Sequence, residues 1–312
     1  LVGYGVSVDS SNHTKGDVNG AGYVGGLIGQ VSSSVTNSYS EGNVTGTIYV
    51  GGLIGNGALI TASSAKGDIN GQNYVGGLAG QTTSSVNNSS SEGDVTGQGN
   101  YVGGLVGYGV SVDSSNHTKG DVSGVYYVGG LAGYTSSAVT GSYSEGNVTG
   151  TGDCVGGAVG SASGKIRNSY AVAKYVRGRN IVGGLAGYVD SIDVSYFEGD
   201  SVRGINKIGG LVGYANKTVD SSYSTVHVKG DDEVGGLVGS AYGDVSNSYA
   251  IGNVVGDVEH SSAGNDNLGG LVGYQYSGSV SKSMALGNVS GTTKLGGLVG
   301  RFDGTTISQS YA

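Results

Sequence analysis

The stretch Tyr23–Gly46 reads YVGGLIGQVSSSVTNSYSEGNVTG, and versions of it recur along almost the whole chain. The glycine pair Gly25-Gly26 returns ten more times, at spacings of 25 to 27 residues with one exception of 34. The apolar residues form short runs of Val, Leu and Ile broken by glycine, a pattern typical of strands. A unit this short cannot bury its own apolar face, so successive units must stack on one another.

We therefore predict an all-β fold: a single-stranded parallel β-solenoid (β-helix) of about twelve coils of about 26 residues, with two or three short strands per coil. Coils stacked about 4.8 Å apart would build a rod on the order of 55–60 Å long. Residues 1–312 are expected to form one continuous repeat domain, a segment of a longer array, with a loop insertion at 257–267. Leucine-rich repeats have a similar period, but the unit lacks their leucine pattern, and we expect no asparagine ladder.

Composition excludes several classes of protein. The chain has 66 glycines in 312 residues and no proline, so it is not collagen, and its 37% apolar content argues against a disordered linker. A single cysteine rules out a disulfide framework. The net charge of −8 has the wrong sign for a nucleic-acid partner, and no apolar run is long enough to span a membrane.

Two parts of the repeat resemble a known family. They are G-G-L-[VIA]-G, as in Gly26–Gly29, and S-Y-[SA]-x-G-[ND]-V, as in Ser142–Val148, and together they resemble the GLUG motif over essentially the whole chain. The resemblance implies a bacterial surface or secreted protein, such as an adhesin or the non-catalytic part of a surface peptidase. It indicates a scaffold and implies no particular chemistry.

A larger duplication overlies the repeat. Residues 1–20 and 105–124 differ at one position only, where Asn19 becomes Ser123. The offset of 104 residues corresponds to four coils. Such near-identity is typical of recent tandem copying, which varies the reach of a long stalk by changing the number of repeats.

Residues one period apart become neighbours in a stack, so each repeat position defines a column. One column alternates lysine and glutamate through six coils: Lys15, Glu41, Lys66, Glu92, Lys119 and Glu145. Each charge then has an opposite charge above and below it, which we interpret as a structural ladder that fixes coil register. Inheritance of two alternating repeat subtypes explains the same pattern, and both explanations can hold.

A second column holds aromatic residues. It contains five consecutive tyrosines, Tyr143, Tyr170, Tyr196, Tyr223 and Tyr249. The column shares strand parity with the charged column, so we expect it to face outward, with Ser38 and Ser40 inside. A structural ladder is the favoured interpretation, and a contact surface for glycans or proteins is the alternative.

A third column follows the leucine of the motif and is apolar throughout: Val2, Ile28, Ile54, Ala79, Val106, Ala132, Val159, Ala186, Val212, Val238, Val272 and Val299. Strict strand alternation would place it outside, as an apolar stripe that requires a partner. A turn at the glycine pair would bury it instead. The sequence leaves these two alternatives open.

Nothing in the repeat indicates catalysis, a metal or a cofactor. The histidines His13, His117, His227 and His260 fall on different coils, and Cys154 stands where five other units carry tyrosine, so we interpret it as a drifted structural residue. The insertion at 257–267 contains Asp257, Glu259 and Asp266, which have calcium-binding chemistry but match no known calcium loop, so a solvated surface loop is favoured.

A basic column provides the one candidate ligand patch. Arg177, Arg203 and Lys229 are spaced one coil apart, with more basic residues near them in sequence: Lys165, Arg167, Lys174 and Arg179. Stacked like charges need counterions. Either the acidic run 231–233 supplies them, or the column binds a sulfated, phosphorylated or uronic-acid ligand.

Taken together, these features favour a non-catalytic structural or adhesive segment of an extracellular or cell-surface protein. We expect a rigid spacer or contact surface that self-associates into fibres or continues into further repeats, with surface glycans or proteins as partners. The alternative is a carbohydrate-binding scaffold attached to a polysaccharide-active enzyme. A weaker option is an ice or crystal binder that uses the column of Thr45, Thr96 and Thr149.

Overall fold

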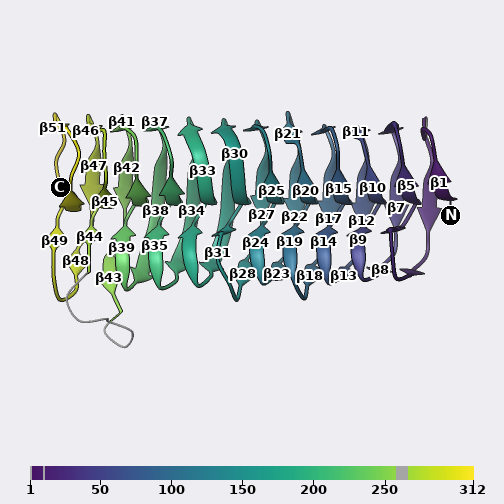
Figure 1. Cartoon of the computed structure of the whole chain (residues 1–312), viewed down its shortest axis with the longest axis horizontal. Coiled ribbons are helices and arrows are strands. Elements are labelled where there is room, and N and C mark those ends of the chain that lie inside the picture. Colours follow the sequence, from purple (N-terminus) through teal and green to yellow (C-terminus); the bar gives the residue numbers. More distant parts are fainter. Residues whose placement is uncertain (1, 10, 258–265) are drawn as a thin grey trace.

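The chain forms a rod of stacked coils with its termini at opposite ends (Figure 1). The computed structural model describes residues 2–9, 11–257 and 266–312. These residues form strands and no helix. Every strand pairs in parallel with its equivalent one coil away, as Val50 does with Val75. The predicted single-stranded parallel β-solenoid is therefore confirmed, with eleven strands along one of its faces, close to the predicted twelve coils.

Each coil has three faces, seen for the coil that starts at Val24. Strand β4 (Val24–Gly25) lies on the face that we call C, β5 (Ile28–Val31) and β6 (Ser34–Thr36) lie on face A, and β7 (Tyr39–Glu41) and β8 (Val44–Thr45) lie on face B. Most coils thus carry more strands than the two or three expected. In the coil that starts at Val24, the strand on face B is interrupted near Gly42, whose φ of 140° is a backbone conformation that favours glycine.

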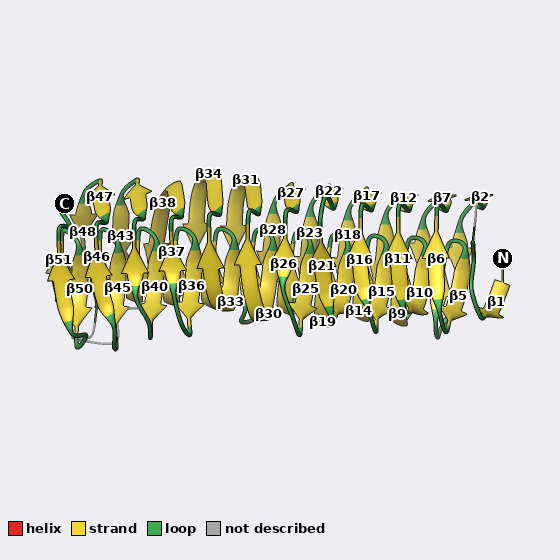
Figure 2. Ribbon diagram, turned by 90° about the horizontal axis from the view of Figure 1, so that it is seen from above, coloured by secondary structure: helices red, strands yellow, loops and turns green. Residues whose placement is uncertain are grey.

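Face A is the sheet of 21 strands, which Figure 2 shows side by side along the rod. Its strands are β1 (Val2–Gly5), β5, β6, β10 (Ile54–Gly57), β11 (Leu59–Thr61), β15 (Ala79–Thr82), β16 (Ser85–Asn87), β20 (Val106–Gly109), β21 (Ser111–Asp113), β25 (Ala132–Thr135), β26 (Val139–Thr140), β30 (Val159–Arg167), β33 (Ala186–Asp193), β36 (Val212–Ala215), β37 (Val219–Asp220), β40 (Val238–Ala241), β41 (Val245–Ser246), β45 (Val272–Gln275), β46 (Ser279–Ser281), β50 (Val299–Phe302) and β51 (Thr306–Ser308).

Face B is the sheet of 19 strands. Its strands are β2 (His13–Lys15), β3 (Val18–Asn19), β7, β8, β12 (Ser64–Lys66), β13 (Ile69–Gly71), β17 (Ser90–Glu92), β18 (Val95–Gly97), β22 (His117–Lys119), β23 (Val122–Gly124), β27 (Tyr143–Glu145), β28 (Val148–Gly150), β31 (Tyr170–Arg177), β34 (Tyr196–Arg203), β38 (Tyr223–Gly230), β42 (Tyr249–Ile251), β43 (Val254–Gly256), β47 (Met284–Leu286) and β48 (Val289–Ser290). In β31, β34 and β38 the two short strands fuse into one of eight residues.

Face C is the sheet of eleven strands. Its strands are β4, β9 (Ile48–Gly51), β14 (Asn73–Gly76), β19 (Asn100–Gly103), β24 (Tyr126–Gly129), β29 (Val155–Gly156), β32 (Asn180–Gly183), β35 (Asn206–Gly209), β39 (Asp232–Gly235), β44 (Leu268–Gly269) and β49 (Leu295–Gly296).

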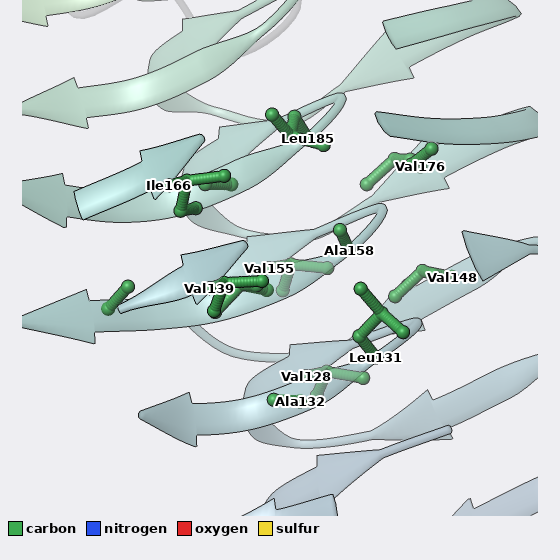
Figure 3. Packing of buried hydrophobic residues seen from close by; sticks show 14 of the residues in the cluster. Val128, Leu131, Ala132, Val139, Val148, Val155, Ala158, Ile166, Val176 and Leu185 are labelled. Carbon is green, nitrogen blue, oxygen red and sulfur yellow. The ribbon is translucent and has the colours of Figure 1, made fainter. Parts of the chain in front are cut away.

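The interior is one continuous column of Val, Leu, Ile and Ala side chains. Figure 3 shows Leu131, Ala158 and Leu185 of successive coils pointing into it. The apolar column after leucine is also buried, from Ile28 to Val272. Of the two alternatives, burial is therefore the correct one, because the chain turns at the glycine pair and both Leu27 and Ile28 face inward.

That turn is too tight for any side chain. A Cβ on Gly129 would lie 2.7 Å from the carbonyl oxygen of Ala158, and one on Gly130 would lie 2.8 Å from the Cβ of Ser144. The Gly130 position would also meet the carbonyl oxygen of Gly157. The glycine pair is thus required by close backbone approach between coils.

A buried serine ladder runs along the corner between faces A and B. The hydroxyl of Ser169 donates to the carbonyl oxygen of Arg167 (2.9 Å) and accepts from the backbone amide of Ser142 (3.3 Å). The amide of Ser169 in turn donates to the hydroxyl of Ser195 (3.2 Å). The residue before the serine has a left-handed backbone, as Asn168 does with φ of 48°, which explains the recurring Asn-Ser of the motif.

A second polar ladder follows the turns of face B, where the sequence led us to expect none. The backbone amide of Asn43 donates to Oδ1 of Asp17 (2.8 Å), and the amide of Asp68 donates to Oδ1 of Asn43 (2.8 Å). The same bond continues through Asp94 and Asp121. The expectation of no asparagine ladder was wrong, because the Asn/Asp that precedes valine in the motif supplies one.

Candidate functional site: the outer columns

The charged column lies on the outer side of face B. Backbone pairing places Lys15 beside Glu41, Glu41 beside Lys66, and so on through Glu92, Lys119 and Glu145. Two ion pairs form, Lys15–Glu41 at 3.1 Å and Lys66–Glu92 at 3.4 Å. The hydrogen bond from Lys15, with its charge, lowers the pKa of Glu41.

The tyrosine column lies next to it and its rings are stacked. Successive ring centroids from Tyr143 through Tyr170, Tyr196 and Tyr223 to Tyr249 are 4.8–4.9 Å apart, with planes within 2° of parallel. The rings are half-buried and face outward, while Ser38 and Ser40, at the repeat positions directly before and after the tyrosine, are buried. Burial, together with the hydrogen bond that its hydroxyl donates to Glu198 (3.1 Å), raises the pKa of Tyr223 to about 12.

The same column contains a gap toward the N-terminus. His13 stacks on Tyr39 with centroids 5.0 Å apart, and His117 stacks on Tyr143 at 5.4 Å. Between these two aromatic pairs the column holds only Ser64 and Ser90. A cavity of about 420 Å³ opens there.

A second aromatic column, which the sequence analysis missed, lies on face C. Tyr23, Tyr49, Tyr74, Tyr101 and Tyr127 stack with centroids 4.8–5.0 Å apart. From Tyr49 to Tyr127 the backbone has φ between 53° and 61°, an uncommon conformation for tyrosine. The signal that could have found this column is the Tyr-Val that precedes the glycine pair in five successive repeats.

Two tyrosines of face A widen this aromatic surface. Tyr108 and Tyr134 stack on each other at 4.9 Å. Their rings meet the face C column edge-on, as Tyr108 does with Tyr101 at 5.5 Å and 83°. The corner between faces A and C thus presents rings in two orientations in this part of the rod.

The basic column is the continuation of the threonine column on face B. Thr149 pairs with Arg177, Arg177 with Arg203, and Arg203 with Lys229. Arg177 lies over the ring of Tyr175 at 4.4 Å, and Lys229 pairs with Asp257 at 3.2 Å. No flat array of threonines forms in this column, because Asn70 and Ser123 separate Thr45, Thr96 and Thr149.

In the acidic run 231–233, Asp232 and Glu233 have partners outside the basic column. Glu233 pairs with Lys207 at 2.5 Å and accepts from the hydroxyl of Tyr276 at 2.8 Å. Asp232 accepts from the side-chain amide of Asn267 at 2.9 Å. Lys165 and Arg167 also lie elsewhere, on face A, where both pair with Asp193 at 3.2 Å.

The described histidine, cysteine and acidic residues that could act in catalysis or bind a metal do not lie together in one site. Nδ1 of His227 accepts from the backbone amide of Asn253 at 3.0 Å, and Cys154 lies half-buried in the face C column, where burial raises its pKa to about 12. No three His, Cys, Asp or Glu side chains gather as a metal site within the part of the chain that the structure describes. His260 and Glu259 lie outside the described residues, as does most of the predicted loop at 257–267; Asp266 accepts from the hydroxyl of Thr292.

Comparison with known proteins gives one result. The family model of the GLUG motif matches residues 20–45, 71–96, 233–255 and 264–290. Neither the curated proteins nor the solved structures contain a match. Among residues 2–9, 11–257 and 266–312 there is no helix with the length and apolar character needed to cross a membrane. The predicted resemblance is confirmed: this chain carries the GLUG motif, repeated along a β-solenoid.

Proposed function

We propose that this chain is a non-catalytic structural segment of an extracellular or cell-surface protein, and that it acts as a rigid spacer. The observation that carries the proposal is the continuity of the three sheets, in which each coil pairs in register with the next. The serine ladder adds an internal hydrogen bond between coils at one corner of the rod, as from Ser142 to Ser169. A rod held this way resists bending between coils.

The duplicated sequence supports the same role. Residues 1–20 and 105–124 are near-identical and four coils apart, so the chain has been copied in whole coils. Each copy of four coils adds about 19 Å of length at the usual strand spacing. Repeat number therefore sets the reach of the spacer, and its outer columns offer surfaces for adhesion or for self-association into fibres.

Distances between spin labels along one column test the rigidity. Thr45 and Arg203 lie in the same column, six coils apart, so labels at Thr45→Cys and Arg203→Cys in a Cys154→Ser background should lie about 30 Å apart. A rigid spacer predicts one narrow distance distribution in pulsed electron resonance. A broad or multiple distribution would contradict the spacer role.

A second function, saccharide binding, is favoured by the aromatic columns. Half-buried tyrosines on face B and at the corner of faces A and C present ring surface and hydroxyl groups together. Tyrosine suits surfaces that are part apolar and part wet. A glycan array probed with the purified chain tests this function, and a chain that binds no saccharide on the array would exclude it.

A further inference from the structure

The gap in the face B column has the dimensions of two missing rings. Tyr39 and His117 are three coils apart in the pairing register, which corresponds to about 14 Å. Stacked rings elsewhere in the column take one coil each. The rings of Tyr39 and His117 therefore face each other across two empty ring positions.

The floor and one wall of this gap are polar. Ser64 and Ser90, both half-buried, lie at the floor where the two rings are missing. The wall consists of Lys66, Glu92 and Lys119 from the charged column. The volume of about 420 Å³ lies within the range of small-molecule sites.

We propose that this slot between Tyr39 and His117 binds one saccharide that carries a carboxylate. A pyranose is a disc with two apolar faces and a hydroxyl-bearing rim. The slot has a matching arrangement, because a pyranose face can lie on the open ring face at an end of the slot while its rim meets the hydroxyl and charged groups of the floor and wall. An aromatic side chain of a partner protein would fit the slot less well than a pyranose, because its apolar edge would lie against the hydroxyl groups of Ser64 and Ser90.

The charge of the wall selects an acidic sugar. Lys66 is paired with Glu92, whereas Lys119 makes no ion pair with any residue that the structure describes. Lys119 belongs to the same strand as His117, so a sugar stacked on the open face of His117 has an ammonium group beside its rim. A carboxylate there forms a charge-assisted hydrogen bond.

The slot occurs once among the described coils of this column. The duplicated His117 is followed by an unbroken run of tyrosines from Tyr143 to Tyr249. One site per chain is therefore expected. This inference rests on the second proposed function, saccharide binding, and does not depend on the spacer role.

Titration calorimetry with a galacturonic acid oligomer tests the slot, with the matching galactose oligomer as neutral control. The informative variant is Ser64→Tyr plus Ser90→Tyr, which extends the ladder through the gap with the residue that the column already uses. We expect the wild-type chain to bind the acidic oligomer with a stoichiometry of one, and the filled variant to bind about tenfold more weakly or not at all. Its thermal midpoint, measured in parallel, reports whether the rod is intact.

Two further variants separate the contributions of charge and stacking. Lys119→Ala should remove the preference for the acidic over the neutral oligomer, and His117→Ala should weaken both. Unchanged affinity in the filled variant overturns the slot and leaves saccharide binding by another column intact. If the wild-type chain binds neither oligomer in the titration, the slot is overturned, and the glycan array then decides separately whether saccharide binding survives.

Discussion

The hydroxyl of Ser40 donates a hydrogen bond of 2.6 Å to the carbonyl oxygen of Gly52. Ser40 lies on face B, and Gly52 is the second glycine of the pair in the next coil, so the bond crosses the interior. The same bond joins Ser91 to Gly104 and Ser144 to Gly157. It links the two halves of the repeat, the glycine pair and the Ser-Tyr-Ser, and explains why they occur together.

Gly130→Ala should destabilise the fold strongly. Its Cβ would meet the backbone of Gly157 and lie 2.8 Å from the Cβ of Ser144, and neither can move without disturbing the next coil. We expect a loss of about 2 kcal/mol or more in the free energy of unfolding, measured with urea. Gly22→Ala is the matched control, because nothing lies within 4 Å of its Cβ position. Equal effects of the two variants would contradict the close-approach explanation.

Ser169→Ala tests the buried serine ladder. The change leaves the backbone amide of Ser142 without its acceptor, at a site where both residues are 1% exposed. An unsatisfied buried donor costs about 1–3 kcal/mol, which urea unfolding would detect. The exposed Ser136→Ala should change stability by less than about 0.5 kcal/mol. A ladder with no energetic role predicts no difference between these two variants.

Lys66→Glu places three glutamates in succession in the charged column. The change removes the ion pair with Glu92 and sets like charges at coil spacing. We expect a lower thermal midpoint at low ionic strength and a smaller difference in high salt, because salt screens exposed charges. Lys282→Glu makes the same charge change at an exposed site outside the column. A salt-independent effect, or an equal effect of the control, would argue against the ladder.

The tyrosine column gives a pH dependence at alkaline pH. The folded pKa of Tyr223 is raised from 10.0 to about 12, chiefly by burial and then by its bond to Glu198. Its neutral form therefore stabilises the fold below pH 10, and that contribution is lost as the pH rises toward 12. Between pH 9 and 11 the wild-type chain should lose more urea resistance than Tyr223→Phe, which cannot ionise. Parallel losses in both proteins would show that Tyr223 is not involved.

The sequence predicted the stacking and the identity of the outer columns, because a nearly constant period leaves one register in which all repeats align. The alternating Lys15 to Glu145 column and the tyrosines from Tyr143 to Tyr249 follow from that register alone. Which side a column faces was harder to predict. Strand alternation holds for Tyr39 and Ser40 but fails at Leu27 and Ile28, where the glycine pair turns the chain.

Other features depend on backbone conformation that residue type does not reveal. Tyr101 has φ of 61°, yet Tyr-Val before two glycines reads as an ordinary strand, so the face C column was missed. The hydrogen-bond ladder through Asp17 and Asn43 needs a turn whose geometry only the structure shows. The slot is similar: Ser64 and Ser90 belong to the same repeat position as the tyrosines, but they line a cavity only because the rings of Tyr39 and His117 lie on either side of them.

The most direct test of the spacer role is the length of the rod after removal of four coils. Deleting residues 21–124 joins Gly20 to Val125 and keeps the repeat continuous, because residues 1–20 and 105–124 are near-identical. Small-angle X-ray scattering should show a maximum dimension about 19 Å shorter with an unchanged cross-section. An unchanged length, or a shorter particle with a wider cross-section, would contradict a rigid spacer whose reach is set by the number of coils.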